Sequence, residues 1–265
     1  MLRLFQIEWI KAKFNMAFWA LLILYMIGVY VLSSIGTGIM NMTADVNGQG
    51  MDLSSINMYN FPQAWHNLTY IASYLKIFLG IAMIVSISNE LQQKTLRQNI
   101  IDGLSKVEFV ITKILFAFML SLAATVFIFA IGCYFGSAYS DQFSFDLVME
   151  RLDFVGAFFL QTFGFLLFSL FIGILIRSTG LAIVFIISYS FLIETFATWI
   201  FLDSDGVLAA LLPMNALDNL IQFPVSLNPA SQVQGFVGLT EVLISAGWLF
   251  IYSGISYLVL LKKDL

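Results

Sequence analysis

Residues 154–176 have the sequence FVGAFFLQTFGFLLFSLFIGILI and contain no Asp, Glu, Lys or Arg. Asp153 and Arg177 flank this stretch. A bilayer core about 30 Å thick is crossed by about 20 apolar residues in a helix. In lipid, a helix satisfies its own backbone polar groups, which a single strand cannot do. The stretch therefore predicts a membrane-spanning helix.

Five more stretches of this kind occur along the chain, each with at most one charged residue. The second and fifth spans contain one charge each, Lys76 and Glu194. The composition agrees, since 60% of the residues are hydrophobic, only 11% are charged and the mean hydropathy is +0.92. We expect an all-α integral membrane protein with one transmembrane domain over residues 1–265. The predicted spans are about 17–36, 68–88, 112–136, 154–176, 179–201 and 241–261.

Lys and Arg residues predict the orientation of these spans, because they accumulate in cytoplasmic loops. With both ends of the chain in the cytoplasm, Arg151 is the only Lys or Arg in an outer loop. The outer loops are instead acidic, and they include Asp218. We therefore expect a multi-pass protein of the plasma (inner) membrane with cytoplasmic termini. The inner side then holds Arg3, Lys11, Lys13, Lys94, Arg97, Lys106, Lys113, Arg177, Lys262 and Lys263.

Residues 1–16 precede the first span and have a weak helical pattern. Apolar side chains recur at spacings of three and four, while the other faces carry charged ones that include Glu8 and Lys11. This pattern predicts an interfacial helix on the inner leaflet, and a simple polar tail is the alternative. The apolar stripe consists of Leu2, Phe5, Trp9, Ala12 and Met16.

The loop between the second and third spans, residues 89–112, has the sequence NELQQKTLRQNIIDGLSKVEFVIT. Residues 90–102 suit a short helix. Gly103 stands where a residue of positive φ ends a helix, and Ser105 with Glu108 forms a capping box for the third span. The positive and negative charges of the loop balance, so we expect the loop to contact another protein rather than anionic lipid.

The segment 203–240, before the last span, mixes apolar runs with Pro213, Pro224 and Pro229. Helical fragments that re-enter the outer leaflet would explain this mixture. The two intramembrane charges lie at similar depth in their spans. We expect Lys76 and Glu194 to form an ion pair or to share a polar cavity. The alternative is that Lys76 extends toward the interface and Glu194 is protonated.

The sequence lacks the motifs of the common catalytic sites. It contains no phosphate-binding loop, no H-E-x-x-H, no G-x-S-x-G and no Cys/His cluster. We therefore expect no catalytic residue, no metal site and no cofactor bound by this chain, and no enzymatic activity of its own. Lipid is an expected partner, and nucleic acid is not.

The residues from Asn89 to Lys113 resemble a segment of the membrane subunits of ABC exporters in the type 2 permease superfamily. The order of elements over the whole chain is also similar to that family: an interfacial helix, six spans and a re-entrant outer hairpin. The matching residues of the segment are Glu90, Thr95, Arg97, Gly103, Ser105, Lys106, Phe109 and Lys113.

This resemblance implies that residues 90–102 form a coupling helix that docks on a separate ATPase subunit, with Arg177 and the N-terminal helix as lesser contacts. It also implies a dimer, with itself or a paralogue, that is bound to two ATPase subunits carrying the ATP and Mg²⁺. The implied docking residues are Glu90, Lys94, Arg97, Gln98, Asn99 and Asp102.

Two other classes of function remain open from the sequence. A stand-alone secondary transporter or channel would usually carry more intramembrane ionisable groups than Lys76 and Glu194. A membrane scaffold or assembly factor without transport activity is the third possibility. An ATP-driven exporter is the function that we expect.

Overall fold

The computed structural model describes residues 2–40, 43–46, 49–52, 58–92, 103, 105–140, 144–176, 178–201, 207–224 and 234–262. Within these ranges, six helical stretches are long and apolar enough to cross a membrane by length and composition. The predicted number and order of membrane-length helices is thus confirmed. The stretches are Met16–Ile35, Gln63–Gln92, Lys106–Tyr139, Phe145–Leu175, Thr179–Ile200 and Leu239–Lys262.

Several helices extend further than the apolar stretches that predicted them. The second spanning helix, for example, continues through Asn89 and Glu90 to Gln92. In chain order the helices are α1 (Leu2–Lys13), α2 (Met16–Met40), α3 (Gln63–Gln92), α5 (Lys106–Tyr139), α6 (Phe145–Met149), α7 (Asp153–Leu175), α8 (Thr179–Ser188), the π-helix η2 (Tyr189–Ile193), α9 (Glu194–Phe201), α10 (Val207–Ala210), α11 (Pro213–Asp218) and α12 (Leu239–Lys262).

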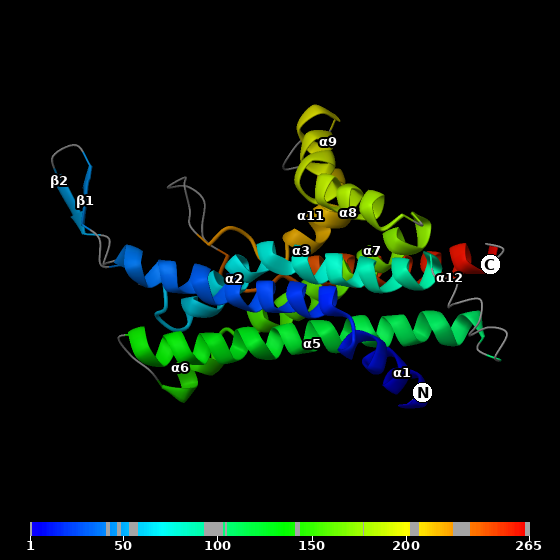
Figure 1. Cartoon of the computed structure of the whole chain (residues 1–265). Helices are drawn as coiled ribbons and strands as arrows, with labels where there is room; N and C mark the ends of the chain where they lie inside the picture. The colour runs from blue at the N-terminus through cyan, green and yellow to red at the C-terminus, as the bar shows by residue number, and fades with distance from the viewer. Residues whose placement is uncertain are drawn as a thin grey trace.

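Helices α3 and α7 pack along each other at the centre of the bundle, and α2, α5, α8 and α12 pack around them. Figure 1 shows both ends of the chain at one end of the bundle and the β-hairpin at the opposite end. We call these the terminal end and the hairpin end.

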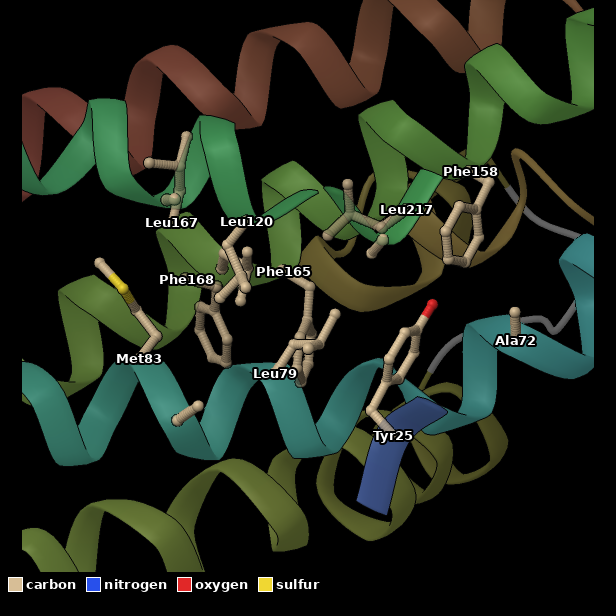
Figure 2. Close-up of a cluster of buried hydrophobic side chains, with 14 of the residues drawn as sticks. Tyr25, Ala72, Leu79, Met83, Leu120, Phe158, Phe165, Leu167, Phe168 and Leu217 are labelled. Carbon is tan, nitrogen blue, oxygen red and sulfur yellow. The ribbon is translucent and has the colours of Figure 1, made fainter. Parts of the chain in front are cut away.

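The centre of the bundle is an apolar cluster built from several helices (Figure 2). Leu79 and Met83 of α3 lie there with Phe165 and Phe168 of α7. Leu217 of the short helix α11 belongs to the same cluster and packs directly on Gly164 of α7, where a Cβ atom would meet its side chain at 2.6 Å. Helix α11 is therefore part of the core and not a free loop.

Two glycines of α5 allow aromatic side chains to lie directly on its backbone. A Cβ atom at Gly132 would overlap Trp65, and one at Gly136 would overlap Phe61. The Trp65 ring also stacks on Phe129 with 5.3 Å between centroids, and its Nε1–H donates to the carbonyl of Val148 at 2.7 Å. Trp65 thereby joins the start of α3 to α5 and α6.

The sequence predicted a single helix for the fifth span, but in the structure this stretch is not one continuous α-helix. Its α-helical hydrogen bonding is interrupted by η2, which has five residues and is followed directly by Glu194. Helix α8 packs against α3 and α7, whereas Figure 1 shows α9 standing clear of the other long helices. Single π-helical turns of this kind occur often at functional sites.

The stretch between α2 and α3 contains two short antiparallel strands, β1 (Thr43–Val46) and β2 (Gln49–Asp52). Thr43 pairs with Asp52 and Val46 with Gln49. The sequence predicted no strand here, because Gly and Asp are poor strand formers and four-residue strands give little alternation to detect.

Candidate functional site

Four charged side chains from three helices meet at the terminal end of the bundle. Glu8 and Lys11 come from α1, Glu90 from α3 and Lys113 from α5. The Lys11 ammonium lies 3.2 Å from Glu8 Oε1 and 3.1 Å from Glu90 Oε2. The Lys113 ammonium donates to both carboxylates. We call these four residues the Lys113 cluster.

Three of the four residues of the Lys113 cluster are buried. Lys113 is 0% exposed, Glu8 4% and Glu90 7%, and the cluster contains equal numbers of positive and negative groups. An isolated charge in such a position costs several kcal/mol, which mutual attraction and hydrogen bonds must offset. Burial alone would raise the pKa of Glu8. The attraction of Lys113, followed by that of Lys11, outweighs burial and holds this pKa below its ordinary value.

Two residues of the Lys113 cluster lie on either side of the segment that connects α3 and α5. Glu90 lies just before residues 93–104, the connecting segment between α3 and α5, and Lys113 lies just after it. Both anchors of the connecting segment are therefore joined to each other and to α1. The predicted docking residues Lys94, Arg97, Gln98, Asn99 and Asp102, together with Arg177, lie outside the described residues.

Two expectations about this region change. Glu90 was expected on a docking surface, but its buried carboxylate faces Lys113 and Lys11 instead. Helix α1 forms as predicted, but its Glu8 side chain faces inward, while Trp9 is 49% exposed. Both differences have the same cause. Helix α5 places the Lys113 ammonium inside the protein, and the nearby carboxylates of Glu8 and Glu90 bind to it.

The predicted capping box is present at the start of α5. Gly103 has φ +99°, a conformation that favours glycine. The Ser105 hydroxyl accepts from the Glu108 N–H at 3.1 Å, and the Ser105 N–H donates to the Glu108 carboxylate at 2.9 Å. The start of α5 is thus fixed at the point where the connecting segment ends.

The predicted ion pair between Lys76 and Glu194 is wrong. Lys76 binds the carboxylate of Asp218 instead. Glu194 accepts a hydrogen bond from the Asn215 N–H at 3.0 Å. The reason is that α11 folds into the bundle and places Asp218 and Asn215 between Lys76 and Glu194. The sequence analysis had paired these two residues because they lie at similar depth in their spans. Asp218 had been assigned to an outer loop because it lies between the fifth and sixth predicted spans.

Helices α10 and α11 form the described part of the predicted re-entrant segment. Met214, Leu217, Leu220 and Ile221 are each at most 2% exposed. The helical fragments that the sequence predicted are present, and α11 packs against α7 and α12.

No protein-family model matches this chain, and no curated protein matches it either. In the described part of the chain, no group of three or more His, Cys, Asp or Glu residues could hold a metal ion.

Acidification is expected to remove the contribution of Glu8 to stability. Because the folded pKa of Glu8 lies below its ordinary value of 4.5, this contribution is complete above that pH and is lost as pH falls through the folded pKa. The difference in unfolding midpoint between the wild type and Glu8→Gln should be greatest at neutral pH and should vanish in acid. A difference that stays constant over the titration would show that the Glu8 carboxylate is not ionised in the folded protein.

Proposed function

We propose that this chain is the membrane subunit of an ATP-driven ABC exporter, which works as a dimer with separate ATPase subunits. The observation that carries the proposal is the Lys113 cluster, which joins both anchors of the connecting segment to α1. The resemblance of residues 89–113 to the coupling segment of that family supports it. In this proposal the termini and the connecting segment face the cytoplasm.

The Lys113 cluster gives this proposal a physical route for force. An ATPase that displaces residues 93–104 moves α3 and α5 together, because Lys113 binds Glu90 across the gap between them. Helix α1 follows through Glu8. Since α3 packs along α7 at the centre of the bundle, the displacement reaches the core of the domain. The chain itself acts mechanically, while ATP and Mg²⁺ bind to the partner.

Lys94 and Arg97 are the strongest candidates for docking by charge. We expect a Lys94→Glu, Arg97→Glu variant to lose most of the ATP hydrolysis that copurifies with the tagged wild-type protein from native membranes. The matched control is Lys262→Glu, which reverses an exposed charge at the same end of the bundle and should keep the activity. Equal hydrolysis by all three proteins would contradict the docking role.

The same preparation separates the other two classes of function. A chain that copurifies with no ATPase but carries out proton-coupled flux in vesicles would be a secondary transporter. A stable complex whose composition and behaviour do not depend on nucleotide would be a scaffold. Either result would overturn the exporter proposal.

A further inference from the structure

A cavity of about 430 Å³ lies between α3, α7, the η2–α9 part of the fifth span and α11. Its size falls in the range of small-molecule sites, about 300–1,000 Å³. The cavity is away from the Lys113 cluster, and the proposed function makes no use of it. Its polar lining includes Lys76, Gln161, Ser190 and Asp218.

Gln161 supplies an acceptor without a partner. Its side chain is 1% exposed, and its Nε2 donates to Asp218 Oδ1 at 2.9 Å. A carboxylate oxygen bound to Lys76 can only accept, so the amide nitrogen must face it and Oε1 must point elsewhere. Among the described residues, Gln161 Oε1 has no hydrogen-bond partner. An unpaired buried acceptor of this kind is unfavourable, and a bound donor would satisfy it.

Asp218 is accessible in the same place. Its side chain is 54% exposed, in contrast to 10% for Lys76, and only its Oδ1 takes part in the bonds to Lys76 and Gln161. The Asp218 carboxylate and the Gln161 amide are in direct contact. Both residues line the cavity, so a ligand there meets them side by side.

The charge of the surroundings favours a cation. The charge of Lys76 is matched by Asp218. The hydroxyl of Ser190, in η2, is unpaired among the described residues and can accept a hydrogen bond. The unpaired groups of the lining thus include acceptors, and an anion would meet the Asp218 carboxylate.

Aromatic side chains form the wall and the mouth of the cavity. The Tyr70 ring lies 5.2 Å from the Tyr74 ring and 5.4 Å from the Phe223 ring, measured between centroids. Tyr74, Phe191 and Phe223 are about half exposed. Such rings offer an apolar surface and also attract cations to their faces.

We propose that this cavity binds a protonated organic amine with an apolar or aromatic body. Its N–H groups donate to Asp218 Oδ2 and Gln161 Oε1, and its body lies against Tyr70 and Phe223. Binding requires no ATP, so this inference is independent of the coupling function proposed above.

The test measures equilibrium binding of phenylbutylammonium to the purified full-length protein in lipid nanodiscs by calorimetry. Two probes with the same body serve as ligand controls: phenylbutanol, which is neutral, and phenylbutanesulfonate, which is an anion. We expect the ammonium to bind at least about tenfold more tightly than either, since one hydrogen bond to a charged group contributes about 1.5–3 kcal/mol.

Two variants locate the site. The double change Lys76→Met with Asp218→Asn removes both charges without leaving either unpaired, and it should weaken ammonium binding about tenfold or more. Gln161→Met keeps the ion pair, so it remains informative if the double variant does not fold, and it should weaken binding several-fold. Glu150→Gln, which removes an exposed carboxylate elsewhere, should change nothing. Undetectable binding by the wild type, equal binding of amine and alcohol, tighter binding of the sulfonate, or full binding by Gln161→Met would each overturn the proposal.

Discussion

Replacing Lys113 with methionine is expected to destabilise the protein by about 3–5 kcal/mol. Methionine can fill the space of the lysine side chain, so the loss is chiefly electrostatic. Glu8 and Glu90 would remain buried, with only the partly exposed Lys11 to balance them. Unfolding of the purified protein by titration with a denaturing detergent, followed by tryptophan fluorescence, measures this loss.

The matched control is Lys11→Met, because Lys11 contacts the same two carboxylates but is 33% exposed at its side chain. Its replacement should cost no more than about 1 kcal/mol, as for exposed ion pairs. Adding Glu8→Gln and Glu90→Gln to Lys113→Met should recover most of the lost stability, since Lys11 is then the only charge left in the cluster and its side chain is 33% exposed. If Lys113→Met were as stable as Lys11→Met, the Lys113 cluster would not bear on stability as proposed.

Replacing Trp65 with alanine is expected to cost about 3–5 kcal/mol, the usual range for a fully buried tryptophan. Trp65 is 0% exposed, lies on the backbone of Gly132 and stacks on Phe129. Its loss would open a cavity between α3 and α5 and leave the Val148 carbonyl without the donor that Trp65 provides. The same detergent titration measures the effect.

Two further substitutions divide this cost into its parts. Trp65→Phe keeps a ring against Gly132 but removes the donor, so it should lose less than Trp65→Ala does. Trp199→Ala removes a tryptophan of α9 that is 79% exposed and should leave the unfolding midpoint nearly unchanged. An equal effect of Trp65→Ala and Trp199→Ala would mean that Trp65 is not packed as described.

The membrane-length helices could be predicted because lipid imposes a simple rule on composition. A stretch such as 154–176 has no charge to place in the bilayer, and its length alone indicates a span. The ends of the helices were harder to place. Residues such as Asn89 and Glu90 continue a helix after the apolar stretch has ended, because the helix is fixed by its neighbours and not by hydropathy.

The partners of the charged residues could not be predicted, because they depend on tertiary contacts. Lys76 and Glu194 were paired because they lie at similar depth in their predicted spans, but α11 brings Asp218 to Lys76 from a distant part of the chain. One signal was available at the other end: Lys113 lies just inside the predicted third span, where a cation needs a partner. Local capping, by contrast, depends on adjacent residues, and Gly103, Ser105 and Glu108 were identified correctly.

The π-helical turn between α8 and α9 has a consequence for the direction in which the fifth span presents its acidic group. An α-helix rotates about 100° per residue, and a π-helical turn accommodates one residue more. Relative to α8, every side chain from Glu194 onward is therefore turned by about one residue's rotation from its place in a continuous α-helix. The direction in which the Glu194 side chain points is thus set by the five residues of η2 and not by the pattern of apolar residues in α8. The apolar residues of α8 can consequently vary without turning this carboxyl group away from Asn215, as long as the extra residue is retained.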